Sequence, residues 1–197
     1  MRTAPVRYAR IAATLLLLAT TVGLQGCAAL FVAGGAAAVM SATDRRTVGA
    51  QLDDENIEIK VAAAIRSDPA LKPVHINVSS FNAIVLLTGE APSAEQRDKV
   101  LAAVRDVAGV RRTVNEIRIA PAAEVSSRSH DSWLTTKVRS RLIAVEDLDS
   151  SHVKIVTENA VIYLMGLVKQ KEAELATNAA TEVSGVARVV KLFEYLD

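Results

Sequence analysis

The sequence predicts an α+β protein built from two small domains in tandem, each with the order helix, strand, strand, helix, strand. The first observation is that the chain repeats itself at an offset of 77 residues, which becomes 76 after one deletion. The second is that apolar residues follow helical and then strand periodicity in the same order in both copies. The recurring identities are Asp54/Asp131, Lys60/Lys137, Val61/Val138, His75/His152, Asn82/Asn159, Ala83/Ala160, Gly89/Gly166 and Glu95/Glu172, followed by Val107/Val183, Gly109/Gly185, Val110/Val186 and Val114/Val190. We therefore expect two copies of one fold, each a three-stranded sheet covered by two helices.

The first helix of each copy is predicted by an apolar stripe. Ile57, Val61 and Ile65 recur every four residues, so this helix should bury them and begin near Asp54 as its N-cap. The equivalent stripe in the second copy should likewise be buried, on a helix beginning near Asp131. Its members are Leu134, Val138 and Leu142.

The rest of each copy is predicted from turn and cap residues. Residues 76–87 alternate and then become continuously apolar around a turn at Asn82, which indicates a β-hairpin. Ser93 is the expected N-cap of a second helix, and Gly109 is the expected end of it. A last strand should follow within residues 110–119.

The first 26 residues have the pattern of an export signal. Three arginines precede an apolar run over residues 11–18, which is too short to span a bilayer of roughly 30 Å. The following Leu24-Gln25-Gly26-Cys27 resembles the lipobox of bacterial lipoproteins. This resemblance implies cleavage after Gly26 and acylation of Cys27, and Ala28 in the next position favours the outer membrane. The alternative is a retained membrane helix continuing through residues 28–32.

These features divide the chain into five parts. We expect a signal peptide at 1–26, an acylated N-terminus and tether at 27–50, a first domain at 51–120, a linker at 121–130 and a second domain at 131–197.

Composition and motifs argue against several function classes. The net charge is +1 and aromatic residues make up 4% of the chain, which argues against a nucleic-acid binder. The single cysteine and the three histidines are too widely spaced in the sequence for a closed Cys/His zinc site. No phosphate-binding loop or nucleophile motif is present, so neither a cofactor nor an enzyme activity is expected. His75 and His152 are best explained by a shared structural role, and the acidic run at 146–149 by a solvated loop.

Several stretches resemble the BON domain (bacterial OsmY and nodulation), and specifically the DolP family of outer-membrane lipoproteins with two BON domains. They are residues 43–49, 115–118, 131–140, 157–159 and 164–168. The resemblance covers essentially the whole mature chain. It implies a lipid-anchored protein facing the periplasm that binds anionic phospholipid of the phosphatidylglycerol or cardiolipin type. It also implies a role in outer-membrane integrity at the division site, and envelope proteins as further partners.

The two copies differ most in their first helices. Residues 53–66 carry a net charge of −2, whereas residues 130–143 carry +2 and have Trp133 in place of Asn56. At about 100° per residue, Trp133 should point away from the buried stripe. We therefore predict a phospholipid-binding surface on this helix, formed by Trp133, Lys137, Arg139, Ser140 and Arg141. Two alternatives remain open at this stage. Trp133 could pack against the first domain as an interdomain anchor, and the protein could be a periplasmic adaptor that binds a protein partner or the cell wall.

Overall fold

The structure, a computed structural model, describes residues 44–121 and 125–196, which belong to one compact unit, Asp44–Asp197. The predicted signal peptide, Cys27 and most of the predicted tether lie outside the described residues. The three buried cores among the described residues are formed by side chains of this unit, so the experiments below use residues 44–197 as the folding unit.

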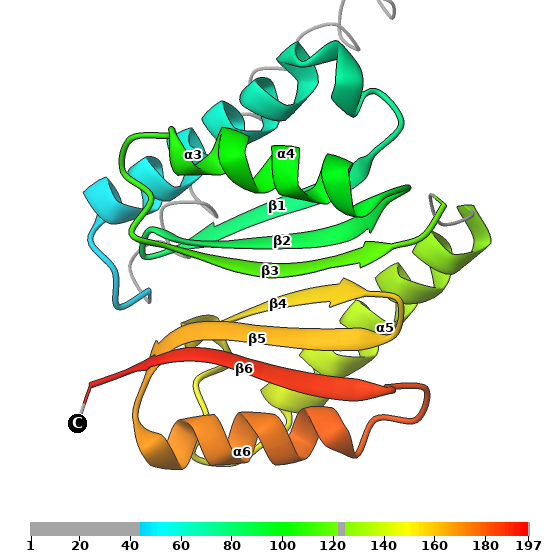
Figure 1. The fold of residues 1–197 in the computed structure, drawn as a ribbon. Helices are drawn as coiled ribbons and strands as arrows, with labels where there is room; N and C mark the ends of the chain where they lie inside the picture. The colour runs from blue at the N-terminus through cyan, green and yellow to red at the C-terminus, as the bar shows by residue number, and fades with distance from the viewer. Residues whose placement is uncertain (1–43, 122–124, 197) are drawn as a thin grey trace, which may run out of the picture. The chain divides into compact units, whose positions relative to one another are not determined.

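Each domain has the predicted element order, which confirms the α+β class (Figure 1). The first domain contains α3 (Val48–Ser67), the short 3-10 helix η1 (Pro69–Leu71), β1 (His75–Phe81), β2 (Ile84–Ala91), α4 (Ala94–Arg105) and β3 (Arg112–Ile119). The second contains α5 (Val125–Ile143), η2 (Ser150–His152), β4 (Val153–Glu158), β5 (Val161–Val168), α6 (Gln170–Thr181) and β6 (Arg188–Tyr195). In each sheet the middle strand pairs antiparallel with the first strand and parallel with the last. Both helices of a domain lie on the same face of its sheet (Figure 1).

The predicted apolar stripes are buried as expected. Ile57, Val61 and Ile65 are at most 6% exposed and pack against β2 and α4. The side chains of Leu134, Val138 and Leu142 are fully buried in the core of the second domain. The register inferred from the 77-residue offset is therefore confirmed.

The predicted starts of the two long helices are wrong. Helix α3 begins at Val48, and the side chain of Thr47 caps it by accepting a hydrogen bond of 3.1 Å from the amide of Ala50. Residues 47–50, expected in the tether, therefore form the cap and first turn of the helix. Helix α5 similarly begins at Val125, inside the predicted linker.

Asp54 holds the hairpin turn instead of capping a helix. Its carboxylate is buried inside α3 and accepts hydrogen bonds from the amides of Asn82 and Ala83, at 2.7 and 2.8 Å. Both turn residues have positive φ, 49° and 62°, as a tight hairpin turn requires. Asp131 makes the two equivalent bonds, also at 2.7 and 2.8 Å. The recurring Asp therefore couples each first helix to the hairpin that it covers.

The recurring glycines of β2 and β5 are explained by a close backbone approach. A Cβ atom on Gly89 would lie 2.1 Å from the carbonyl oxygen of His75, and one on Gly166 would lie 2.4 Å from that of His152. No side chain can be accommodated at these distances, so the paired strands require glycine. The recurring histidines contribute their backbone carbonyls to this contact.

Two arginines just before α3 make contacts with both domains. Arg45 donates two hydrogen bonds to the carboxylate of Glu172 at the start of α6, at 2.6 and 2.8 Å. Arg46 pairs with Asp54 at 2.7 Å, and its guanidinium lies 3.8 Å from the centre of the Phe81 ring. This segment is thus a structured part of the protein.

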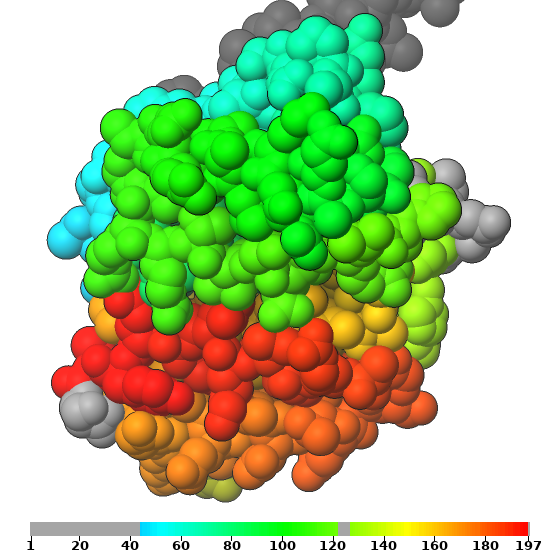
Figure 2. Space-filling model, viewed as in Figure 1, coloured from blue at the N-terminus to red at the C-terminus, as the bar shows by residue number. Residues whose placement is uncertain are grey.

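The helix-free faces of the two sheets pack against each other. Their apolar contact is centred on Phe81, Ile84, Leu86, Tyr163 and Met165, all at most 5% exposed. Charged pairs surround this cluster, among them Lys154 with Glu58 at 2.7 Å. Figure 2 shows the atoms of the first domain directly against those of β6.

The buried stripe of α5 generates a first prediction. Truncating Leu142 to Ala should lower the free energy of unfolding by about 2–5 kcal/mol, because it opens a cavity in a close-packed core. Urea unfolding of residues 44–197, followed by circular dichroism, measures this. As a control, Ile59→Ala removes an isoleucine that is 58% exposed and should cost about 0.5 kcal/mol or less. Equal costs for the two variants would contradict the assigned core.

The Arg45–Glu172 pair generates a second prediction. Hydrogen bonds from Arg45 lower the pKa of Glu172 from 4.5 to about 2. Because the folded-state pKa is the lower one, this pair stabilises the fold above pH 4.5 and loses that contribution as the pH falls towards 2. Glu172→Gln should therefore be destabilising at about pH 7 and nearly neutral at about pH 2, as measured by urea unfolding. Glu95 is the matched control, since it occupies the same repeat position but its side chain is 77% exposed. Glu95→Gln should have little effect at any pH, and an equal effect of both variants would contradict the role of Arg45.

Candidate functional site

Helix α5 presents two different faces. Its buried stripe faces the sheet, and Trp133 projects from the other side with 52% of its surface exposed. Since the apolar side of the helix is already satisfied by the core, packing within the domain does not require an exposed indole. An exposed tryptophan is therefore the first sign of a binding surface here.

A groove of about 500 Å³ lies between this exposed side of α5 and the loop from α6 to β6. It is lined by Trp133, Thr136, Lys137, Ser140, Arg141, Ala144, Glu182, Val183 and Ser184. The structure thus brings together four of the five residues predicted for the phospholipid-binding surface.

Trp133 and Lys137 form one unit at one end of the groove. The ammonium group of Lys137 lies 4.2 Å from the centre of the indole ring. It also donates a hydrogen bond of 3.3 Å to the carbonyl of Ser184. The ring centre of His130 lies 5.5 Å from that of Trp133. These contacts hold a cation directly over an exposed aromatic surface.

Arg141 has a partner that the sequence reasoning did not foresee. Its guanidinium donates a hydrogen bond to the carboxylate of Glu182, and both side chains are more than half exposed. The pair reduces the positive charge that the groove presents. Lys137 also lines the groove, and no carboxylate among the described residues pairs with it.

Arg139 does not belong to this groove. It is exposed, but its position on the helix is about 120° around the axis from Trp133. It is absent from the groove lining. The prediction that it acts with the other four residues is thus not supported by their geometry.

The sequence analysis missed the loop residues of the groove and two further residues of α5. Glu182 to Ser184 approach α5 because Gly185 lies close against it, where an added Cβ would be 3.1 Å from Leu134 and 3.9 Å from Trp133. Gly185 is the repeat equivalent of Gly109, the expected end of the second helix, but nothing in the sequence shows what this turn contacts. Thr136 and Ala144 of α5, also missed, complete the lining on the helix side.

The interdomain alternative for Trp133 finds no support in its contacts. Its described ring contacts, with His130 and Lys137, are both to residues of α5 in the second domain. About half of the Trp133 surface is exposed.

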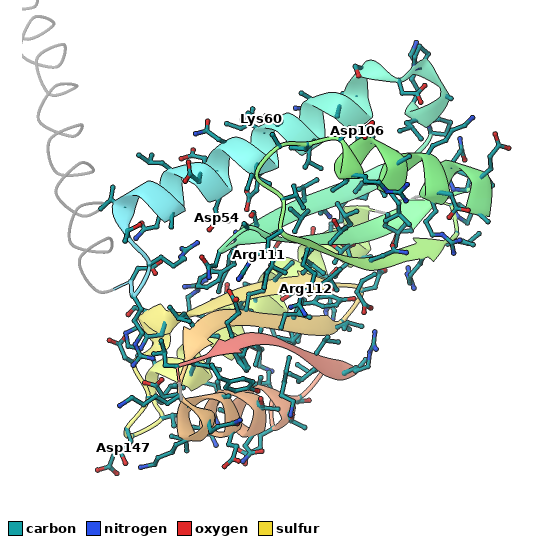
Figure 3. The ribbon with its side chains drawn as sticks, turned by 60° about the vertical axis from the view of Figure 1, so that its left-hand side comes forward. Asp54, Lys60, Asp106, Arg111, Arg112 and Asp147 are labelled. Atoms are coloured by element: carbon teal, nitrogen blue, oxygen red, sulfur yellow. The ribbon has the colours of Figure 1, made fainter. Side chains whose placement is uncertain are left out.

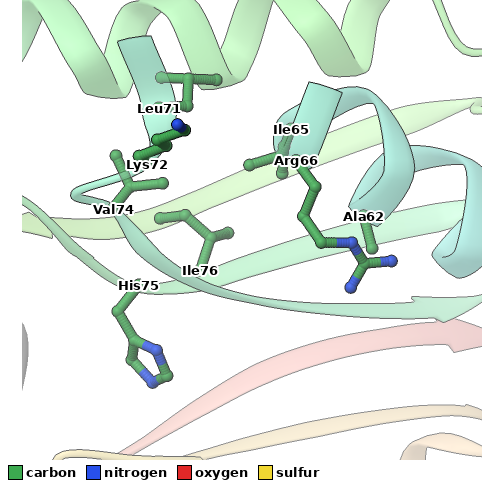
Figure 4. Close-up of a pocket in the computed structure, with 8 residues that line it drawn as sticks. All are labelled: Ala62, Ile65, Arg66, Leu71, Lys72, Val74, His75 and Ile76. Carbon is green, nitrogen blue, oxygen red and sulfur yellow. The ribbon is translucent and has the colours of Figure 1, made fainter. Parts of the chain in front are cut away.

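The first domain has a hollow in a different place. It measures about 360 Å³ and lies between the end of α3, η1 and β1 (Figure 4). Its walls include the core residues Ile65 and Leu71, and Arg66 and Lys72 border it. The imidazole of His75 points away from Leu71 and Lys72 in this view. The cations are not brought to one point, so the arrangement offers no defined chemistry.

We also searched the described residues for a metal site, a membrane-spanning helix and a role for the acidic run at 146–149. Over residues 44–121 and 125–196, no three His, Cys, Asp or Glu side chains are grouped as a metal site. No helix among these residues is long and apolar enough to cross a membrane. In the acidic run at 146–149, Asp147 pairs with Lys171 at 2.9 Å and Asp149 caps η2. That run therefore has local structural partners.

Comparison with known proteins identifies the class. The BON domain model matches residues 53–121 and again residues 130–197. The chain therefore belongs to the BON-domain family, as a protein with two BON domains of the DolP type.

Three relatives refine this assignment. Outer membrane lipoprotein DolP of Haemophilus influenzae is 40% identical over 183 residues, covering 92% of this chain and 95% of that protein. The 21 kDa hemolysin of Actinobacillus pleuropneumoniae is 39% identical over 156 residues, covering 78% of this chain and 79% of the relative. Osmotically-inducible protein Y of Escherichia coli is 30% identical and covers 72% of both chains. These similarities support an outer-membrane lipoprotein of the BON family.

Proposed function

We propose that this protein is lipid-anchored in the outer membrane, faces the periplasm and binds anionic phospholipid through the α5 groove of its second domain. The observation that carries the proposal is the exposed Trp133 with the Lys137 ammonium 4.2 Å from its ring centre. An indole is favoured at the headgroup level of a bilayer, where its apolar ring and polar N–H both find suitable surroundings. A nearby lysine adds about 1 kcal/mol of attraction to an anionic surface.

Cys27 is the proposed acyl attachment site. One acyl chain gives only marginal membrane binding, so two or three chains on the N-terminal cysteine are needed for stable anchoring. The anchor then holds the α5 groove near a bilayer at high local concentration, and a weak headgroup contact suffices. By resemblance to the DolP family, the proposed lipid is of the phosphatidylglycerol or cardiolipin type. The proposed role is support of outer-membrane integrity at the division site.

A periplasmic adaptor that binds an envelope protein is the second candidate. It is favoured by a different feature, three exposed apolar side chains along one side of α3. They are Val48, Leu52 and Ile59, each at least 55% exposed. Acidic residues of α3 accompany this stripe, so an anionic bilayer is a poor partner for it. The lipid and adaptor functions therefore use different helices.

The α5 groove generates a third prediction, which tests the proposed function. Residues 44–197 should co-sediment with phosphatidylglycerol vesicles, less so at high salt, and should not co-sediment with phosphatidylcholine vesicles. Trp133→Glu and the double variant Lys137→Glu/Arg141→Glu should each lose most of this binding. The matched control is Lys60→Glu, because Lys60 occupies the position of Lys137 in the first repeat. It should bind as the unmodified chain does. Equal binding by all four folded proteins would contradict the proposal.

The Arg141–Glu182 pair generates a fourth prediction. Glu182→Gln removes the carboxylate that neutralises Arg141, so binding to phosphatidylglycerol vesicles should strengthen severalfold. The same co-sedimentation assay measures it, with Glu174→Gln as a control for the loss of one negative charge on α6. If the two variants bind equally, the gain comes from net charge and the groove assignment of Arg141 is wrong.

A further inference from the structure

His130 is an exposed histidine beside Trp133 that neither the fold nor the proposed lipid site uses. It lies about one helical turn before Trp133 on α5, and its ring centre is 5.5 Å from that of the indole, with an angle of 33° between the two planes. Its Nε2 atom lies close to Gly185, 3.9 Å from where a Cβ on that residue would be. It is not among the residues that line the α5 groove. His130 therefore extends the surface around the indole toward the start of the helix.

The first domain shows that the fold does not require a histidine at this position. Helices α3 and α5 begin at equivalent positions of the repeat, so His130 corresponds to Asp53, which is also exposed. The lysine recurs, and Figure 3 shows Lys60, the equivalent of Lys137, on a different side of α3 from the buried Asp54. The second domain thus carries a group that can become a cation where the first domain carries a carboxylate.

No carboxylate of the described residues pairs with His130. Both oxygens of Asp131, the next residue, accept hydrogen bonds from the backbone of the turn between β4 and β5. Glu182, in the turn after α6, pairs with Arg141. The charged group that shares the indole with His130 is the ammonium of Lys137. A proton on the imidazole therefore adds a second positive charge beside the indole.

We infer that His130 is a further, pH-dependent binding residue of the α5 site, whose protonation strengthens attachment to anionic phospholipid. This inference rests on the proposed function. A histidine side chain gains its charge between about pH 8 and about pH 5, so binding should strengthen as the pH falls. The 5.5 Å between the two ring centres is shorter than the Debye length of about 10 Å at 0.1 M ionic strength. The charge therefore acts on the headgroups around a bound indole, and by linkage an anionic bilayer favours the protonated imidazole.

Vesicle co-sedimentation at two pH values tests this role, with residues 44–197 and phosphatidylglycerol vesicles at about pH 7.5 and about pH 5.5. Exposed carboxylates stay ionised throughout this range. The lower pH should strengthen binding about fivefold, the attraction that one additional cation supplies at an anionic surface. His130→Gln should lose this pH dependence and keep the binding seen at the higher pH. His130→Lys should bind at both pH values as the unmodified chain does at the lower one.

Asp53 provides the matched control. In the His130→Gln background, Asp53→His returns an imidazole to the chain at the equivalent position of the first domain. Asn56 stands there in place of Trp133, so the pH dependence should not return. Its return would show that the net charge of the protein controls binding, and would overturn the inference.

Tryptophan fluorescence tests the contact between His130 and Trp133 without any lipid. Trp133 is the only tryptophan of the chain, and a protonated imidazole quenches an indole that it contacts. Emission from residues 44–197 should therefore fall between about pH 8 and about pH 5, and His130→Gln should abolish the fall. A fall of the same size in His130→Gln would overturn the inference.

The vesicle experiment separates failure of this inference from failure of the proposed function. If phosphatidylglycerol vesicles are not bound at either pH, the α5 proposal is wrong and the role of His130 with it. If binding is equally strong at both pH values, or if His130→Gln keeps the full pH dependence, only the role of His130 is overturned.

Discussion

The two central strands are covered on both of their faces, and the arrangement of the two domains depends on this burial. All eight residues of β2 are buried, as are six of the eight in β5. Two helices cover only one face of each three-stranded sheet, so a single domain would leave the other face in water. The contact centred on Phe81, Leu86 and Met165 buries that face. Because the sheets cover each other, the four α-helices that the structure describes lie on the outside.

This outward placement makes the helices available for function. Each first helix buries one stripe in its domain core, while its opposite side is not used by the fold. The repeat shows how these free sides diverge, since Trp133 and Arg141 replace Asn56 and Ala64. The reverse change occurs at the α4–β3 turn, where the first domain carries Arg105 and Arg111 in place of Thr181 and Ala187. One scaffold thus presents different charged surfaces in its two copies.

The sequence predicted the fold well where periodicity reports burial directly. Stripes such as Leu134, Val138 and Leu142 were placed correctly, because a helix must repeat its buried side every three to four residues. The predicted starts of α3 and α5 were wrong because the sequence shows that a side chain can cap a helix but not which backbone amides it binds. Asp54 has the chemistry of an N-cap, yet its carboxylate binds the amides of a turn 28 residues further along the chain. Only tertiary contact decides between these two uses of one side chain.

For the candidate site, the sequence by itself determined the repeat, the two core stripes, the BON resemblance and the outward direction of Trp133. These follow from local geometry, since residues on one helix have fixed angular positions. The tertiary structure decided the rest: it paired Arg141 with Glu182, placed Lys137 beside Ser184 and left Arg139 outside the groove. It also set the two sheets face to face. The physical reason is that these contacts join residues more than 40 positions apart, and their distances depend on how complete elements pack.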